Sequence, residues 1–473
     1  MEPPPDDRRP PRVAILGGGI TGLAAALQLH DAEEPIDWTL FEAAPRLGGV
    51  LETAERDGYR IELSADNFLT RDPWATDLCK RVGLADELLP TDPKRRRALV
   101  VHRGQIRRVP EGFVLMAPKK AWPILASPIL SPAGKARLMA EPLIPRRRDM
   151  ADESVAAFSR RRLGRETFDR LIQPLVSGIY TADPDRLSMA ATMPQFVADE
   201  REHGSLLRAS LFSGKAGAAA SRSESGARYG MFVAPRFGLQ QLVDAVAAAL
   251  PAERLRLNTL VESVQRTAED VWRIVDGEFD ELIVTLPTRP ASRVLRGVAP
   301  VLASSLAGID YAGCSVVCLG VKAAQIERPV EGFGFVVPTI EKRPLIAASF
   351  ASYKFPGRAP DSSVMIRAFV GGALQPELAD RDDADLVELV RAELGNLVGL
   401  RGAPEFTRVV RWPERMPQYH VGHLDRVAEI EALASEAGIE LAGAAYRGVG
   451  VPQCIHSGEQ AADRVLQRCG RPS

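Results

Sequence analysis

Apolar and polar positions near the start of the chain predict alternating strands and helices. Residues 13–16 (VAIL) form a continuous apolar run, and residues 20–29 have the alanine- and leucine-rich composition of a helix. A second apolar run follows at residues 38–41. Continuous apolar runs of this length are typical of strands that are buried on both faces of a parallel sheet. The pattern therefore predicts a strand, helix and strand that begin an α/β domain.

Later parts of the chain are predicted to return to the same sheet. Residues 255–264, 272–275 and 281–287 read as three strands, and we expect them to rejoin the N-terminal ones. Near the C-terminus, the glycine-rich residues 441–452 precede a helix predicted over residues 457–467. The resulting fold class is α/β, with a two-part Rossmann-like domain, a mixed-sheet substrate domain and a helical insertion.

Glycines after the first strand have a spacing that suits a phosphate. Gly17, Gly19 and Gly22 follow the pattern G-x-G-x-x-G. The first allows a tight turn, the second admits a pyrophosphate against bare backbone, and the third lets helix and strand approach. Glu42 ends the second strand, where a carboxylate can accept hydrogen bonds from a ribose diol. We predict a dinucleotide site, and the alternative is a plain strand-to-helix turn with a solvated glutamate.

Composition narrows the class of protein. The chain has 473 residues, of which 45% are hydrophobic, so two or three domains are expected. The 60 basic and 61 acidic residues give a net charge of -1, which does not favour nucleic acid. Five cysteines without paired spacing favour a reducing compartment, and residues 1–11 read as a disordered lead-in without an export signal. We expect a cytoplasmic protein.

Residues 42–49 (EAAPRLGG) resemble the E-x-x-x-R-x-G-G signature of the FAD-dependent amine oxidase and porphyrinogen oxidase superfamily. Arg46 offers donors to a phosphate, and Gly48 and Gly49 let a loop run close to a flat cofactor; a solvated arginine before a turn is the alternative for Arg46. Residues 441–452 resemble the terminal flavin segment of that superfamily. The resemblance implies FAD, and we expect it to be bound non-covalently because the C-terminal cysteines lie in no covalent-flavin motif.

Further stretches resemble bacterial oxygen-dependent porphyrinogen oxidases. They are residues 153–155, 160–164, 174–184, 350, 355–358, 369–372 and 417–423. This resemblance implies oxidation of protoporphyrinogen IX to protoporphyrin IX by oxygen, with release of hydrogen peroxide, in haem biosynthesis. The first alternative is oxidation of coproporphyrinogen III to coproporphyrin III on the same fold. The further alternatives are an amine oxidase-like enzyme and a non-catalytic flavin-binding protein. Residues 62–67 lack a glycine of many relatives, and Gln453 replaces an aspartate.

Candidate site residues follow from the residues and from the resemblance. A porphyrinogen carries propionates, so its pocket needs a cation beside apolar walls. Arg97, at the end of a basic run, is the closest match to the arginine that the family places at the start of a hairpin strand, and a solvated charge run is the alternative. The candidate walls are Ile179, Tyr180, Phe333 and Phe335, and the alternative is plain core, where aromatic and branched residues more often lie. The expected cofactor residues are Gly17, Gly19, Ile20, Thr21, Gly22, Glu42, Arg46, Gly48, Gly49, Val261, Gly443, Gly450 and Val451.

Three interpretations complete these candidates. The resemblance implies that the backbone of Val261 contacts the adenine, and a core valine is the alternative. His420 and His423 have no clustered carboxylate or cysteine neighbours, so a structural pair is predicted and no metal site is expected. No catalytic side chain is identified, because the flavin carries the chemistry.

The sequence also predicts domain limits. The FAD-binding domain is expected from residues 12–75, 228–290 and 425–473, the substrate-binding domain from 76–112 and 291–424, and the helical insertion from 113–227. Within the insertion, residues 113–148 predict either short amphipathic helices on a membrane surface or an ordinary helical subdomain. Residues 203–228, rich in glycine, serine and alanine, predict a mobile loop. The expected partners are porphyrinogen and oxygen, with a peripheral membrane contact and a homodimer left open.

Overall fold

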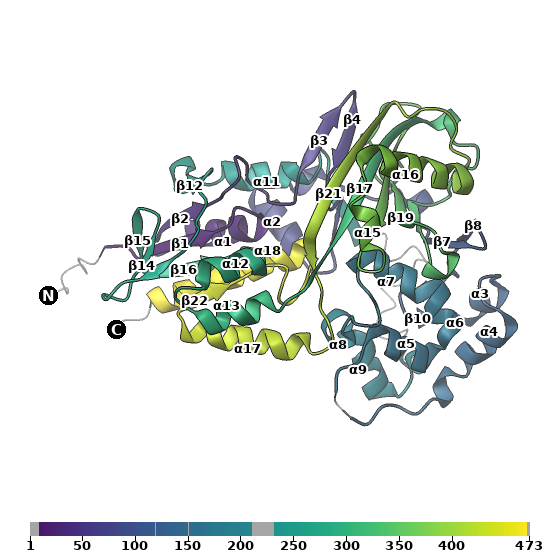
Figure 1. Cartoon of the computed structure of the whole chain (residues 1–473), viewed down its shortest axis with the longest axis horizontal. Coiled ribbons are helices and arrows are strands. Elements are labelled where there is room, and N and C mark those ends of the chain that lie inside the picture. The colour runs from purple at the N-terminus through teal and green to yellow at the C-terminus, as the bar shows by residue number, and fades with distance from the viewer. Residues whose placement is uncertain (1–8, 119, 150, 211–230, 471–473) are drawn as a thin grey trace.

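The computed structural model describes residues 9–118, 120–149, 151–210 and 231–470. Figure 1 shows three regions, which are a sheet flanked by helices on the left, long antiparallel strands at the upper right and a group of helices at the lower right. The predicted lead-in lies largely outside the described residues, as does the predicted loop from residue 211 onward.

The first region is a five-stranded parallel sheet built from both ends of the chain. Its strands, in spatial order, are β12 (Leu255–Arg256), β2 (Asp37–Phe41), β1 (Arg12–Leu16), β16 (Glu281–Val284) and β22 (Ile439–Leu441). Val13 and Ile15 face one hydrophobic cluster, whereas Ala14 and Leu16 face another. The sheet is therefore covered on both faces, as its continuous apolar strands require.

Helices complete both faces of this sheet. The first face is covered by α1 (Ile20–His30), α2 (Trp74–Arg81), α11 (Leu239–Ala248) and α18 (Val451–Cys469), and the second by α12 (Thr288–Leu295), α13 (Pro300–Ala307) and α17 (His423–Glu436). This arrangement confirms the predicted α/β class with a Rossmann-like domain. α2 was expected with the substrate domain, but its residues Ala75, Leu78 and Cys79 pack into the core of the parallel sheet.

The strand predictions for the middle of the chain are partly wrong. Only Leu255–Arg256 of the first segment pairs with the sheet, and the rest of that segment, including Val261, has no strand structure. Residues 272–274 form β14 in a separate antiparallel sheet with β13 (Gln265–Arg266) and β15 (Gly277–Phe279). Trp272 and Ile274 are buried while Arg273 is exposed. That alternation belongs to a strand with one buried face, not to a central parallel strand.

A seven-stranded mixed sheet forms the second region. Its spatial order is β21 (Phe406–Pro417), β17 (Tyr311–Lys322), β20 (Ser363–Gly371), β19 (Leu345–Phe350), β18 (Gly334–Val336), β7 (Leu99–His102) and β8 (Gln105–Arg108). The pairs are antiparallel except for β18 with β7. α16 (Asp383–Val398) packs against one face through a hydrophobic cluster with β7, β17 and β20. On the other face, Tyr59 and Ile61 pack against Cys318 and Met365, and a further part of this face borders a cavity.

Smaller elements lie beside these two sheets. They are the hairpin β3 (Thr53–Arg56) and β4 (Tyr59–Glu62), the three-stranded sheet β5 (Phe68–Leu69), β11 (Phe232–Pro235) and β6 (Leu88–Pro90), and the short helices α14 (Ala351–Lys354) and α15 (Pro376–Ala379).

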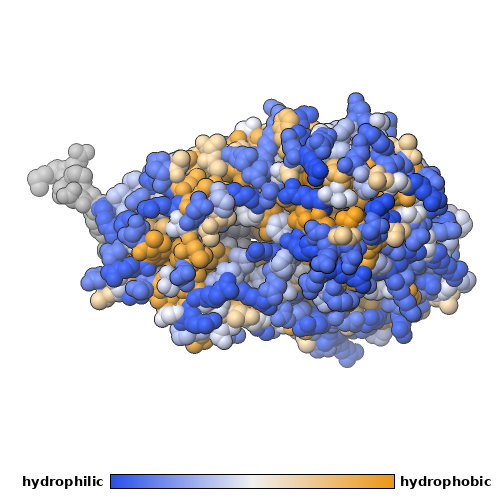
Figure 2. All heavy atoms as spheres, turned by 45° about the horizontal axis from the view of Figure 1, so that its top comes forward, coloured by the Kyte–Doolittle hydropathy of each residue, from blue (hydrophilic) through white to orange (hydrophobic). Residues whose placement is uncertain are grey.

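The third region is helical. It contains the strands β9 (Phe113–Val114) and β10 (Ala117–Pro118) and the helices α3 (Ala121–Ala126), α4 (Pro132–Met139), α5 (Val155–Leu163), α6 (Arg165–Thr167), α7 (Gln173–Tyr180), α8 (Met189–Thr192) and α9 (Pro194–His203). A single hydrophobic cluster includes residues of α4, α5 and α7. None of the helices in the described residues is long and apolar enough to cross a membrane. Figure 2 shows one face of the whole molecule, on which hydrophilic side chains surround hydrophobic patches.

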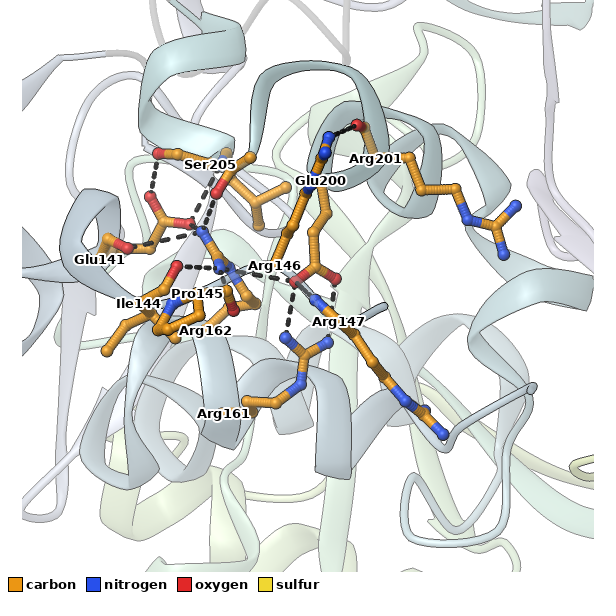
Figure 3. Close-up of polar contacts among 12 residues, drawn as sticks. Glu141, Ile144, Pro145, Arg146, Arg147, Arg161, Arg162, Glu200, Arg201 and Ser205 are labelled. Atoms are coloured by element: carbon orange, nitrogen blue, oxygen red, sulfur yellow. Dashed lines mark hydrogen bonds and ion pairs between the residues drawn. The ribbon is translucent and has the colours of Figure 1, made fainter. Parts of the chain in front are cut away.

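A buried charge network ties this helical region together (Figure 3). The side chains of Arg162 and Glu141 are both 0% exposed and form an ion pair. Arg162 also donates to the carbonyl oxygens of Ile144 at 2.8 Å and Gly204 at 2.9 Å, and it lies 3.4 Å from a carboxylate oxygen of Glu200. Buried charges are tolerated only when they are well paired and hydrogen-bonded. The network therefore fixes the segment after α4 against α5 and the end of α9.

Candidate cofactor and substrate site

A cavity of about 820 Å³ extends from the parallel sheet to the mixed sheet. Residues that follow β1, β2, β16 and β22 line one end of it, so the cavity lies outside the carboxyl ends of the parallel strands. This is where ligands bind in open α/β sheets. The candidate residues that line the cavity are Gly17, Gly19, Ile20, Thr21, Glu42, Gly48, Gly49, Arg97, Ile179, Phe333, Phe335, Gly443 and Val451. Gly22, Arg46, Val261, Gly450 and Tyr180 are not among its lining residues.

Each of the three glycines of the turn is required for a different structural reason. Gly17 has a φ of +109°, which favours glycine. A Cβ added to Gly22 would lie 1.9 Å from the carbonyl oxygen of Gly17, so this glycine lets α1 pack against β1. A Cβ on Gly19 would meet no protein atom within 4 Å, yet Gly19 lines the cavity. Open space beside Gly19, at the N-terminus of α1, fits a pyrophosphate.

Glu42 is held in a fixed orientation at the edge of the cavity. Its Oε2 accepts a hydrogen bond of 2.6 Å from the backbone N–H of Gly18, and its Oε1 accepts one of 2.8 Å from Ala44. A carboxylate has about four lone-pair positions, so two backbone donors leave acceptor capacity for ribose hydroxyls.

Arg46 braces the loop that carries Gly48 and Gly49. Its Nη1 donates to the carbonyl oxygens of Leu47 at 2.9 Å and Leu51 at 3.0 Å, and its Nη2 pairs with Glu52 at 3.0 Å. The predicted contact with a phosphate stays a prediction, and the partners of Arg46 in this structure are those of its own loop. The loop in turn docks on the glycine turn, because the N–H of Gly48 donates to Gly18 at 2.8 Å.

The C-terminal segment closes the same end of the cavity. Gly443 has a φ of +126° and donates its N–H to Ser457 Oγ at 3.0 Å. α18 begins at Val451 rather than at residue 457, with Gly450 as its N-cap and proline in its first turn. The N-terminus of this 19-residue helix faces the cavity through Val451 and Cys454. A helix N-terminus carries partial positive charge and can stabilise an anionic ring.

Tyr419, His420 and His423 have structural partners beside this segment. The ring of His423 stacks on Tyr419 at 3.9 Å, and its Nε2 lies 2.9 Å from the carbonyl oxygen of Tyr446. Tyr419 donates to Ala444 and accepts the N–H of Gly448 at 2.8 Å. His420 Nδ1 lies 3.3 Å from a carboxylate oxygen of Asp310. Burial lowers the pKa of both histidines, so both favour the neutral form.

The far end of the cavity has broad apolar walls. Ile179 projects from α7, and Phe333 and Phe335 come from β18 and the residue before it. Tyr180 is an exception among the candidate walls, because its side chain packs in the helical core and its hydroxyl donates to Thr192 at 3.3 Å. Successive residues of a helix point in directions roughly 100° apart, which separates Tyr180 from Ile179. Arg97 lines this end and is 42% exposed, with Nη1 at 3.8 Å from Glu331.

Four charged residues in the cavity wall were not among the candidates, namely Asp66, Lys354, Arg367 and Arg415. Asp66 pairs with Lys354 at 3.0 Å and with Arg367 at 3.4 Å, and all three line the cavity. Burial alone would raise the pKa of Asp66, but the two cations outweigh it and bring this pKa to about 2. One positive charge is therefore left over among side chains that are at most 11% exposed, where it can stabilise an anion. A signal existed, because Arg367 is the only charged residue in the apolar strand β20.

Other ionisable groups of the wall keep their protons. Burial raises the pKa of Cys314 to about 11 and raises that of Tyr311 above its usual range. Burial also raises the pKa of Cys454 to about 11. No histidine is among the described residues that line the cavity. These cysteine and tyrosine side chains are therefore poor bases at neutral pH.

The fold and this cavity define a flavin-dependent oxidoreductase of the dinucleotide-binding type. The cradle of Gly17 and Gly19, the carboxylate of Glu42 and the N-terminus of α18 meet at one end, and an apolar chamber opens at the other. The chain belongs to the flavin containing amine oxidoreductase family, whose family model matches residues 20–466.

Similar proteins cover nearly the whole chain. A protein of Bacillus subtilis (strain 168) named coproporphyrinogen III oxidase is 34% identical over 464 residues, which cover 96% of this chain and 97% of the relative. A chloroplastic protoporphyrinogen oxidase of Nicotiana tabacum is 30% identical over 478 residues, which cover 95% of this chain and 84% of that relative. A crystal structure from Exiguobacterium superposes with a TM-score of 0.85 at 29% identity and covers 97% of this chain and 99% of that one.

Proposed function

We propose that this chain is an FAD-dependent porphyrinogen oxidase and that its substrate is coproporphyrinogen III. The observation that carries the proposal is a single cavity that joins a dinucleotide cradle to an apolar chamber with cations at its wall, including Arg97, Lys354 and Arg367. A porphyrinogen is a broad apolar ring that carries carboxylates, and such a chamber suits both parts. The resemblance to the Bacillus subtilis relative supports the substrate with four propionates.

The residues of the chain would hold the cofactor as follows. Gly17, Gly19 and the N-terminus of α1 face the pyrophosphate, Glu42 accepts from the ribose, and Gly443 with the N-terminus of α18 borders the ring. We infer non-covalent binding of FAD. When bound, FAD supplies the acceptor for hydride equivalents from the reduced macrocycle and passes them to oxygen, giving hydrogen peroxide.

The protein contributes mainly by positioning its substrate. Ile179, Phe333 and Phe335 hold the macrocycle in an apolar chamber that excludes water, and Arg97 binds a propionate at the chamber edge. Cys314 and Tyr311 keep their protons at neutral pH, so neither side chain serves as the base that accepts the pyrrole protons.

Protoporphyrinogen IX is the second candidate substrate, because the plant relative carries that activity in its name and the same chamber would hold the ring. The two substrates differ in two propionates that are replaced by vinyl groups. A side-by-side assay therefore decides between them.

The test is turnover of both porphyrinogens by the flavin-loaded protein in air, followed by porphyrin fluorescence, with non-enzymatic oxidation subtracted. We expect porphyrin and hydrogen peroxide from coproporphyrinogen III, with a smaller kcat/KM for protoporphyrinogen IX. Anaerobic addition of substrate should bleach the flavin absorbance. A protein that holds flavin but neither bleaches nor turns over would overturn the proposed activity and favour a non-catalytic flavin-binding protein.

We also infer a peripheral membrane contact at α3. Trp122 and Leu125 of this helix are 77% and 41% exposed, and Leu143 is 80% exposed in the same helical region. Exposed apolar side chains near basic residues suit the surface of an anionic bilayer. Co-sedimentation with anionic vesicles, and its loss in Trp122→Ser, tests the contact. A homodimer stays a prediction of the sequence, which sedimentation velocity tests.

A further inference from the structure

A second cavity lies beside the first, between the β7–β8 hairpin and α3. Its volume is about 690 Å³, and we call it the basic groove. Its ionisable lining residues are Lys94, Arg96, Arg97, Arg107, Arg108 and Glu111. Five cations against one carboxylate give the groove an excess of positive charge. Arg97 lines both the basic groove and the main cavity, so the two spaces meet at this side chain.

The cations of the groove are only partly neutralised by the protein. Arg108 forms an ion pair with Glu331, which also lies 3.8 Å from Arg97. Arg107 donates to the neutral side chain of Gln105, and within the described residues Lys94 forms no ion pair. The groove therefore retains charge that can be matched by anions from outside the chain.

Hydrogen bonds within the protein fix the orientation of Arg96 in the groove. Its Nε donates to Thr91 Oγ1 at 3.1 Å, and its Nη2 donates to the carbonyl oxygen of Thr91 at 2.9 Å. Pro93, Pro110, Pro123 and Pro128 also line the groove. Prolines restrict the backbone, so the cations are presented from a constrained frame.

We propose that the basic groove binds the additional propionates of a tetracarboxylate porphyrinogen and thereby selects it over a dicarboxylate one. This inference rests on the proposed function and adds the residues that set its substrate. A propionate held by Arg97 stands at the junction of the two spaces, so a neighbouring propionate can enter the groove. Leaving that carboxylate against an apolar wall would be costly, whereas Lys94 and Arg107 offer charge-assisted hydrogen bonds.

The choice between the two substrates depends on whether their substituents can contact the cations of the basic groove. A ring with four propionates places anions against the cations of the groove. A ring with vinyl groups in two of those positions gains nothing from Lys94 and Arg107 and leaves the groove to water. Specificity is a difference between two affinities, so cations that only one substrate can reach produce discrimination.

The experiment compares Lys94→Gln, Arg107→Gln and the double variant with the wild type. The matched control is Arg165→Gln, because Arg165 is an 88% exposed cation of the helical region and lines neither cavity. The readout is the ratio of kcat/KM for coproporphyrinogen III to that for protoporphyrinogen IX. We expect this ratio to fall roughly tenfold in each single variant, as for loss of one charge-assisted hydrogen bond, and to stay at the wild-type value in the control.

Equal losses for both substrates, or an unchanged ratio in the double variant, would overturn the inference. Loss of binding to anionic vesicles with an unchanged ratio would also overturn it, because the groove would then serve lipid headgroups. If the wild type oxidises neither substrate, the proposed function fails and the groove is judged by binding alone. Coproporphyrin III fluorescence titrations then decide, since a weaker affinity in the double variant than in the control supports the groove and an equal affinity overturns it.

Discussion

The Oε2 atom of Glu42 accepts a hydrogen bond of 2.6 Å from the backbone N–H of Gly18, inside the glycine turn. The carboxylate at the end of β2 and the turn at the end of β1 are therefore one unit. The other carboxylate oxygen of Glu42 accepts a hydrogen bond of 2.8 Å from the backbone N–H of Ala44. The direction of the remaining lone pairs is therefore set before a ligand arrives.

Glu42→Gln is predicted to weaken FAD binding. The amide cannot accept on both sides, and loss of hydrogen bonds to a charged acceptor costs about 1.5–3 kcal/mol, equivalent to a roughly ten- to hundredfold weaker affinity. Titration of the apoprotein with FAD, followed by flavin fluorescence, measures the change. Glu33→Gln is the matched control, because Glu33 is exposed on the loop before β2. An unchanged affinity would contradict a role for Glu42 at the ribose.

Gly19→Ala and Gly22→Ala should separate cofactor binding from folding. The new Cβ at residue 19 meets no protein atom within 4 Å, so we expect the free energy of unfolding of the apoprotein to change by less than about 0.5 kcal/mol. The same methyl should obstruct the pyrophosphate and abolish flavin retention. At residue 22 the Cβ would lie 1.9 Å from the carbonyl oxygen of Gly17. Gly22→Ala should therefore also lower the free energy of unfolding of the apoprotein, by about 1–3 kcal/mol.

Urea denaturation of the apoproteins and flavin content after purification provide the two measurements. Gly297→Ala is the control, because its Cβ would also meet nothing within 4 Å and Gly297 is not among the residues that line the cavity. Full flavin occupancy in Gly19→Ala would show that the pyrophosphate lies elsewhere.

Asp66→Asn should destabilise the protein in a pH-dependent way. The pKa of Asp66 is depressed on folding, from 3.8 to about 2, so its contribution is present above the unfolded value and is lost as the pH falls toward about 2. This shift corresponds to about 2 kcal/mol, and the variant also leaves Lys354 and Arg367 without their carboxylate, so we expect a total loss of about 3–5 kcal/mol at neutral pH.

Urea denaturation of Asp66→Asn and the wild type between pH 7 and pH 3 measures this effect. The difference in free energy of unfolding between the wild type and Asp66→Asn should be constant from pH 7 to about pH 5. It should begin to shrink near the pKa of an aspartate in the unfolded chain, which is about 4. Asp276→Asn, at a 68% exposed site, serves as the control. A difference that already vanishes at pH 5 would contradict the depressed pKa.

Arg162→Met is predicted to loosen the helical region (Figure 3). It leaves Glu141 buried without its cation, and breaking a buried pair in this way costs about 3–5 kcal/mol. Hydrogen exchange should increase in α5 and α9. The double variant Arg162→Met with Glu141→Leu should recover part of the loss, because it removes the uncompensated charge. A single variant that costs less than about 1 kcal/mol would argue against the network.

The N-terminal part of the site could be predicted because its chemistry is local in sequence. Gly17, Gly19 and Gly22 have a fixed spacing, and Glu42 follows the next strand. The role of Arg46 could not be read in the same way, because its partners are carbonyl oxygens whose directions depend on how the loop folds.

Long-range contacts explain the remaining differences. Asp66 and Lys354 are separated by 288 positions and meet only because the loop after β4 and the end of α14 converge on the cavity. The separate sheet around β14 was readable from the alternation of Trp272, Arg273 and Ile274, but apolar content alone suggested a central strand. A pattern reveals which face of an element is buried, and it does not say which distant element buries it.

The contact between α1 and α18 has a consequence for biosynthesis. A Cβ on Gly458 would lie 2.1 Å from the carbonyl oxygen of Thr21, so the two helices cross almost backbone to backbone. At typical translation rates, roughly 20 to 90 seconds separate the synthesis of the first glycine turn from that of α18. During that interval a nascent chain holds only half of the nucleotide cradle. Flavin loading is therefore expected after translation of α18, and a ribosome stalled before residue 451 would carry a chain that cannot retain the cofactor.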